Sequence, residues 1–491
     1  MVTAMKLSKK CEVLMQSKLN ETVQMEKDLI MVKKASNDGI TSDERLMKLS
    51  AKVRSYARDA ILLQFWTSSR YGVLRFILFT FIGCAMLYGG YLLNVNPLIK
   101  EGDIFVVVLS VALIASEISD IIRHYHAVNK GVAAALQIRN LAQSDHEFTF
   151  LRKDNKDCPT DQITITLITA PELARRIVPS KNCYSSLPFI TCTKNVLRNY
   201  NYHKIFLILS LVLAFAAGLE QPSYNIIMER IFTAILGNTS DIQLLIRCAI
   251  ALSIIGFSTL LTRTASAVLA AVASEYMAVS FRVILARYYL KSSATDHYSK
   301  SEIEALVDKN QSLTTEAKSL YHPHLTQLII RLTSLIVNIT IGFISSWEIS
   351  LLGLVIIVFC FCAQIEMQFQ CLHHYCDFSD TQFIKKKNKS VKACRDYVYK
   401  AASLSIVQTS VLILKAVCYA LTAYICNHGY KHQSQAFLSV ITLSSAVQEV
   451  VLLPKLFKKL HKSWKSLDQT FACMHTESFK NLPSIQSNFK S

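Results

Sequence analysis

Eight long apolar stretches divide the sequence and constrain its fold more than any other feature. They cover about 71–94, 102–124, 203–232, 245–272, 326–345, 349–371, 403–427 and 434–453. A membrane-spanning helix needs about 20 mostly apolar residues, and every stretch has this length. The chain is 51% hydrophobic and 18% charged, whereas soluble domains carry about 25% charge. The sequence therefore predicts an all-α, multi-pass membrane protein rather than a soluble protein with buried helices.

A polar break in the segment GFISSWEISLLGLV (342–355) predicts a helical hairpin. Ser346, Trp347 and Glu348 separate two apolar stretches that are each long enough to cross a membrane once. Tryptophan favours the membrane–water interface, and a carboxylate needs water. We therefore expect two helices joined by a very short turn at one membrane surface.

The distribution of basic residues predicts the orientation. The connections between paired stretches are short and poor in Lys and Arg: 95–102, 237–241, 345–348 and 427–433. The alternate segments are long and basic: 1–70, 125–202, 273–325, 372–402 and the tail. Basic loops stay cytoplasmic, so we expect both termini inside, in an integral protein of the plasma membrane. The net charge of +18 then reflects topology, and no nucleic-acid partner is expected.

The sequence shows no familiar catalytic motif. A phosphate-binding loop needs two glycines five positions apart followed by Lys and Ser or Thr, and none of the 13 glycines is so spaced. The cluster CLHHYCD (371–377) has no second pair of ligands at a zinc-like spacing, so no metal site is expected. Asn238 begins a glycosylation sequon, Asn-Thr-Ser, on an expected outer connection.

Four segments carry a resemblance to a known family. They read AAGLEQPSYNIIMERIF (216–232), SEYMAVSFRVILARYYLKS (274–292), SEIEALVDKNQSLTTEAKSLYHPHLTQL (301–328) and IGFISSWEISLLGL (341–354). Together they resemble the second transmembrane domain of P-glycoprotein-like ATP-binding-cassette (ABC) exporters. Residues 58–140 resemble the last two helices of a first such domain.

The resemblance implies a six-helix type-1 transmembrane domain plus an extra helix pair. The expected units are a cytoplasmic helical arm, a partial first transmembrane domain, a cytoplasmic connector, the six-helix domain and a cytoplasmic tail. Their ranges are 1–70, 71–140, 141–202, 203–460 and 461–491. Both ATPase domains of the family are expected to be missing, as in a truncated exporter. ATP and Mg²⁺ are therefore implied only through a partner or a missing domain.

Polar residues within apolar stretches are candidates for a translocation path, because they are costly in a membrane and usually face protein or a cavity. The candidates are Glu117, Glu220, Gln221, Lys415 and Gln448. Each could instead be a buried polar partner or lie just outside the bilayer. A role in the path is less expected for Asp120 and Glu449, which lie near the cytoplasmic ends of their stretches. The resemblance adds a possible ATPase-coupling turn at Asp296, His297 and Tyr298.

Two functions remain open at this point. The resemblance implies the pore-forming portion of a multidrug-type exporter that moves amphipathic or lipid-like molecules with an ATPase-bearing subunit or a second copy. Alternatively, the chain is a non-transporting relic or a regulatory partner of an intact exporter. The expected loss of helices and ATPase domains favours the second function, whereas the extent of the resemblance favours the first.

The orientation can be tested by cysteine labelling in intact cells. An impermeant thiol reagent should label Asn238→Cys, on an expected outer connection, and not Lys386→Cys, within the basic run near 385–392. Labelling of the second variant from outside would contradict the assignment.

Overall fold

In the computed structural model the chain is described at residues 15, 17–28, 39–95, 201–236, 242–291, 300–359, 412–428 and 433–475. Scattered positions within 102–135 and 361–409 are described as well. Across these residues every regular element is a helix, and none is a strand. This agrees with the predicted all-α class.

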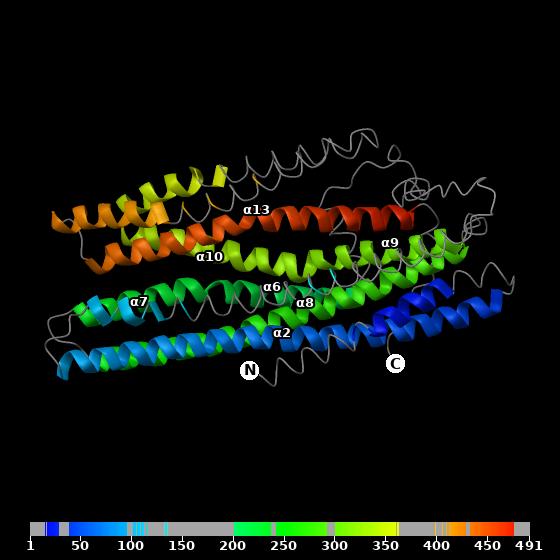
Figure 1. The fold of residues 1–491 in the computed structure, drawn as a ribbon, viewed down its shortest axis with the longest axis horizontal. Helices are drawn as coiled ribbons and strands as arrows, with labels where there is room; N and C mark the ends of the chain where they lie inside the picture. Colours follow the sequence, from blue (N-terminus) through cyan, green and yellow to red (C-terminus); the bar gives the residue numbers. More distant parts are fainter. Residues whose placement is uncertain are drawn as a thin grey trace, which may run out of the picture.

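The helices lie roughly along one direction and give the molecule an elongated shape (Figure 1). The labelled elements are α2 (Gly39–Val95), α6 (Asn201–Gly218), α7 (Glu220–Leu236), α8 (Ile242–Lys291), α9 (Lys300–Ser319), η3 (Leu320–Leu325), α10 (Thr326–Ser345) and α13 (Gln433–His475). Two shorter apolar helices span Trp347–Phe359 and Leu412–Asn427.

Among the described residues, five helical spans are long and apolar enough to cross a membrane. They are Leu46–Val95, Lys204–Ile235, Ile242–Arg287, Leu306–Ser345 and Gln433–Gln469. Five of the eight predicted stretches lie within these spans, and two more overlap the shorter helices. The stretch 102–124 and the proposed division into domains stay predictions, since much of the chain that they involve lies outside the described residues.

The predicted break near Trp347 is confirmed as a junction between two helices. Helix α10 ends at Ser345, and Ser346 is extended with φ −154° and ψ 105°. The Ser346 hydroxyl donates to the Glu348 carboxylate at 3.1 Å, and the next helix begins at Trp347. The Trp347 side chain is 59% exposed, as expected for a residue at a membrane surface.

Helices α2 and α8 form a long pair along much of the molecule (Figure 1). Glycine lets their backbones approach, as small residues commonly do between membrane helices. A Cβ on Gly83 of α2 would lie 3.1 Å from the Ala249 Cα of α8, and one on Gly256 of α8 would lie 3.1 Å from the Phe76 Cα of α2. Larger side chains at either glycine would push the pair apart.

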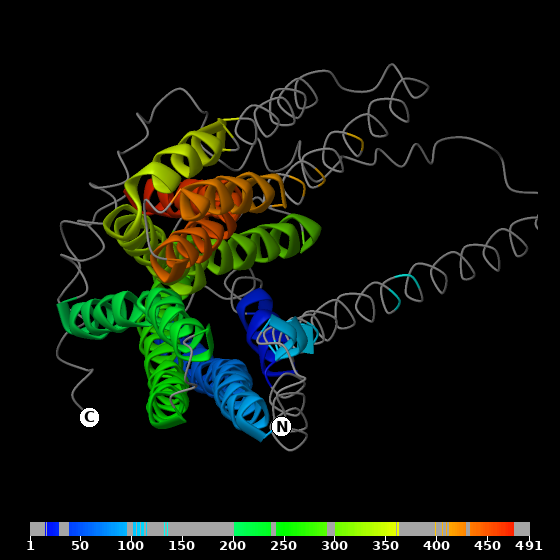
Figure 2. The ribbon, with the colours of Figure 1, turned by 90° about the vertical axis from the view of Figure 1, so that its left-hand side faces the viewer.

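Seen from one end, the helices form two groups (Figure 2). Helices α2, α7 and α8 share one apolar core around Met86, Met228 and Leu252. Helix α13 and the two shorter helices share another core around Ile349, Cys418 and Leu443. The two groups meet where α10 and α13 contact α6 and α7.

An N-terminal arm, residues 17–28, packs against the end of α2. Ion pairs hold it in place: Lys18 contacts Asp59 of α2 at 2.6 Å, Lys27 contacts Asp308 of α9 at 3.0 Å, and Glu21 contacts Lys52 of α2 at 3.6 Å. Between them, Glu26 is only 5% exposed. Burial raises the Glu26 pKa to about 7, although the Arg282 charge opposes this shift.

The buried Glu26 carboxyl should make the docking of this arm depend on pH. Its pKa in the unfolded arm is about 4.5 and in the docked arm about 7, so the docked arm binds the proton more tightly. The contribution of Glu26 to docking should be largest below pH 4.5, fall by up to about tenfold in the docking equilibrium per pH unit as the pH rises toward 7, and then level off. Hydrogen exchange of residues 17–28 in detergent would measure this.

Glu26→Gln should remove the dependence and protect the arm at pH 8. The matched control is Asp28→Asn on the same arm, because Asp28 is exposed and accepts a hydrogen bond from Gln24 of the arm itself. A pH profile that is the same in the wild type and Glu26→Gln would contradict the assignment to Glu26.

Candidate functional site

Charged side chains from five apolar helices gather where the two helix groups meet. We call this set the arginine cluster; its members are Tyr71 and Arg75 of α2, Glu220 of α7, Arg263 of α8, Arg331 of α10 and Glu449 of α13. Ionisable side chains inside membrane spans are rare and commonly functional. The cluster is therefore the strongest candidate site in the part of the chain that the structure describes.

A break between α6 and α7 places Glu220 in the cluster. Leu219 is a turn residue between the two helices, and Pro222 has no N–H with which to continue the helical hydrogen bonds. Gly218 sits closely against α10, where an added Cβ would lie 2.8 Å from the Ile330 carbonyl oxygen. The first turn of α7 thus begins with a carboxylate facing the interior of the bundle.

The Glu220 carboxylate is buried, with 3% of its side chain exposed, and Arg263 is its main partner. The Nε and Nη2 atoms of Arg263 lie 2.8 and 2.7 Å from Glu220 Oε2. The other oxygen, Oε1, is 3.9 Å from Arg75 Nε and accepts no hydrogen bond. One carboxylate therefore joins α7 to α8 directly and attracts α2 at longer range.

The Tyr71 ring lies within cation–π distance of both guanidinium groups of this helix pair. The Arg75 and Arg263 Cζ atoms are 5.7 and 5.5 Å from the ring centroid. Arg75 also donates to the Tyr71 hydroxyl at 3.3 Å. Cation–π attraction to the ring contributes to holding two like charges near one another.

A second ion pair joins the other helix group. Arg331 Nη1 of α10 donates to Glu449 Oε2 of α13 at 2.8 Å, and Glu449 also lies within electrostatic range of Arg263 and Arg75. Three guanidinium groups thus face two carboxylates, which leaves one positive charge. An uncompensated arginine at the middle of a membrane costs about 2.5–3.5 kcal/mol on insertion scales.

A neutral polar network continues from the cluster along α7. Asn225 donates to the Asn338 side-chain oxygen of α10 at 2.9 Å and to the Ser445 hydroxyl of α13 at 3.2 Å. Gln221 lies one turn from Asn225 and 3.4 Å from Ser445. These contacts satisfy buried amides that the membrane could not solvate.

The structure brings together two of the predicted path residues, Glu220 and Gln221. Lys415 lies half-buried on the helix Leu412–Asn427, and Gln448 is exposed on α13. Glu220 is paired with Arg263. Several other predicted residues lie outside the described residues: Glu117, the coupling turn Asp296, His297 and Tyr298, and the sequon at Asn238.

The sequence reasoning missed three of the charges that matter most. Arg75, Arg263 and Arg331 each lie inside a predicted apolar stretch, which is a signal as strong as the one that singled out Glu220. Glu449 was expected to matter little, yet it pairs with Arg331. The pairing itself could not be read from the sequence, because its partners are more than 40 positions apart.

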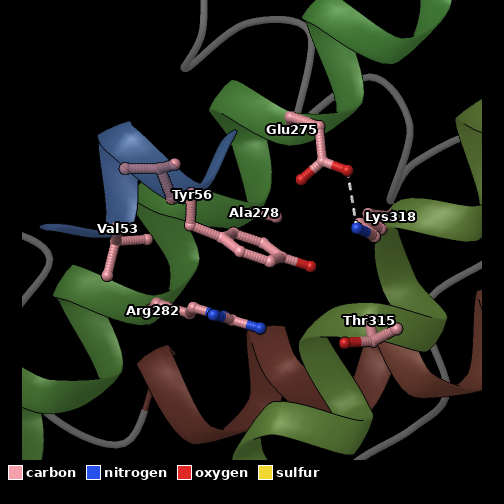
Figure 3. A pocket seen from close by; sticks show the side chains of 8 residues that line it. Val53, Tyr56, Glu275, Ala278, Arg282, Thr315 and Lys318 are labelled. Atoms are coloured by element: carbon pink, nitrogen blue, oxygen red, sulfur yellow. Dashed lines mark hydrogen bonds and ion pairs between the residues drawn. The ribbon is translucent and has the colours of Figure 1, made fainter. Parts of the chain in front are cut away.

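A small cavity lies farther along the bundle, where α2, α8 and α9 meet (Figure 3). Tyr56 projects between Arg282 and the ion pair of Glu275 with Lys318, which has an N–O distance of 2.6 Å. The cavity volume is about 10 Å³, which suits a single water molecule. The buried Arg282 Nε has no hydrogen-bond partner, so a water is the occupant that the site can accommodate, and a transported molecule does not fit.

The comparisons with known proteins find a distant similarity to a P-glycoprotein. No protein-family model matches the chain. The chain is similar to P-glycoprotein 14 of Caenorhabditis elegans, with 28% identity over 169 residues. The matched segment amounts to 34% of this chain and 12% of the length of that protein. The similarity agrees with the resemblance stated above, and the six-helix exporter architecture stays a prediction.

The Glu220–Arg263 pair should behave as an energetic unit. Glu220→Gln leaves two neighbouring guanidinium groups without their closest counter-charge, and breaking a buried pair costs about 3–5 kcal/mol. Thermal unfolding in detergent should therefore show a clear loss of stability, and Arg263→Gln added to the first change should recover part of it. Glu229→Gln on the same helix is the control and should have little effect. Additive losses in the double variant would show that the two residues do not act together.

Proposed function

We propose that the chain is the transmembrane portion of an ABC-type exporter that moves amphipathic molecules such as lipids or xenobiotics. The energy would come from ATP hydrolysis on a partner subunit or on a domain outside this sequence. Membrane-length helices and the distant similarity to a P-glycoprotein support this proposal.

The observation that carries the proposal is the position of the arginine cluster. Its charges come from α2, α7 and α8 on one side and from α10 and α13 on the other. A protein that only had to be stable in a membrane would be better served by apolar residues there, because replacing a buried ion pair by well-packed apolar residues is often neutral or stabilising. Charges retained between two helix groups favour a polar path for part of a substrate.

Each residue of the cluster has a separate task in this proposal. Glu220 holds Arg263 and attracts Arg75, so it keeps two guanidinium groups at the junction. The Arg331–Glu449 pair joins α10 to α13 and would move with them if the two helix groups separated. Such a rearrangement would open and close access to the cluster. Alternating access requires a transport path to open and close in this way.

The proposal is tested by uptake into proteoliposomes. Purified chain, reconstituted with an ATPase-bearing ABC subunit, should accumulate a fluorescent lipid or drug tracer in the presence of Mg-ATP. The chain alone should neither hydrolyse ATP nor accumulate tracer, because no phosphate-binding loop is found in the sequence. Uptake without ATP or a partner would overturn the coupling. If the chain does not transport the tracer but changes the ATPase rate of an intact exporter, the result would instead favour a regulatory role.

A further inference from the structure

The arginine cluster contains more hydrogen-bond donors than its own acceptors can use. Each guanidinium carries five N–H donors, whereas the contacts of Arg75, Arg263 and Arg331 within the cluster involve only two carboxylates and one tyrosine hydroxyl. The five ionised side chains sum to one positive charge. A single anion would neutralise the remaining charge and would accept hydrogen bonds from unused donors.

The unused donors are accessible, whereas the central carboxylate is not. The side chains of Arg75, Arg263 and Arg331 are 33%, 24% and 28% exposed, compared with 3% for Glu220. The Glu220 carboxylate is thus the buried centre of the cluster, and the arginine side chains are its partly exposed members. This arrangement suits recognition of a carboxylate, sulfate or phosphate, for which arginine offers paired donors.

The depth of the cluster identifies the kind of molecule that would carry the anion. Arg75 lies 20 residues before Val95, the end of α2, and Arg263 lies 21 residues after Ile242, the start of α8. At about 1.5 Å per residue, both lie about 30 Å from the helix ends that join the short connections. Arg331 lies 14 residues before Ser345, the end of α10, or about 21 Å from the hairpin turn. The hydrocarbon core is about 30 Å thick, so the cluster lies in the half of the core far from the short connections, which the predicted orientation places on the cytoplasmic side.

We propose that Arg75, Arg263 and Arg331 bind the anionic headgroup of an amphiphile at the level of the cytoplasmic leaflet. The headgroup is a carboxylate, sulfate or phosphate, and the apolar tail lies along the surrounding membrane helices. As a statement about a transported substrate this rests on the proposed function, whereas the binding itself does not. The same chemistry occurs in single-chain acids and in anionic phospholipids, and the cytoplasmic leaflet is rich in the latter.

The test measures binding to the full chain purified in a nonionic detergent. The probe is a fluorescent fatty acid with a free carboxylate, followed by anisotropy, and its methyl ester serves as the uncharged analogue. The carboxylate should bind at least tenfold more tightly than the ester. Competition with oleate, with phosphatidylglycerol and with inorganic phosphate then distinguishes a single-chain amphiphile, a membrane lipid and a free anion as the source of the headgroup.

Two substitutions should move the affinity in opposite directions. Arg331→Gln removes one positive charge and should weaken binding of the carboxylate probe about tenfold, while Arg331→Lys should retain most of it. Glu449→Gln removes a competing carboxylate and should tighten binding severalfold. A purely structural role for the cluster would weaken binding in both variants. Arg247→Gln, at an exposed position near the start of α8, is the control and should have no effect.

The outcomes separate this inference from the proposed function. Equal affinity for the carboxylate and the ester would overturn the anion site. So would weaker binding of the carboxylate probe by Glu449→Gln, provided that this variant unfolds at the wild-type temperature. Displacement by inorganic phosphate as effective as that by oleate would overturn the requirement for an amphiphile. Charge-selective binding without uptake in proteoliposomes would support the site and contradict transport.

Discussion

The burial of the Glu220 carboxylate is the constraint on which much of the bundle interior depends. A carboxylate inside a membrane protein must find a positive partner, because neither lipid nor apolar side chains can solvate it. Glu220 finds Arg263 at 2.7 Å and Arg75 at longer range. That requirement constrains how α7 lies against α8 and α2, and the break at Leu219 is what places Glu220 within reach of both arginines.

The arrangement of the other helix group follows from the same constraint. Arg331 and Glu449 form a second ion pair between α10 and α13. The side-chain amides of Asn225 and Asn338 join α7 to α10 through a direct hydrogen bond. In lipid, apolar contacts alone do little to specify which helices contact one another, because lipid tails are as apolar as the helix surfaces. Polar pairs therefore specify which helices meet, while glycines such as Gly83 and Gly256 allow α2 and α8 to approach closely.

Away from the arginine cluster, charged side chains join neighbouring segments near the other end of α2, α8 and α9. Lys18, Lys27 and their carboxylate partners fasten the N-terminal arm to α2 and α9, and Glu275 with Lys318 does the same between α8 and α9. Among the described residues no ion-pair partner of Glu26 is found, and Glu26 carries the raised pKa that burial produces. The arm is consequently the part of the described structure whose stability responds to pH near neutrality.

The sequence by itself determined that this is a helical membrane protein, because a run of about 20 apolar residues has few alternatives to a spanning helix. It also determined the junction at Ser346, where a local change from apolar to polar residues ends one helix and begins another. Only the tertiary structure decided which charges meet. Arg75, Glu220, Arg263, Arg331 and Glu449 are visible in the sequence as isolated charges in apolar stretches. Their pairing depends on helix rotation and depth, which are set by contacts between residues far apart along the chain, and no local pattern encodes them.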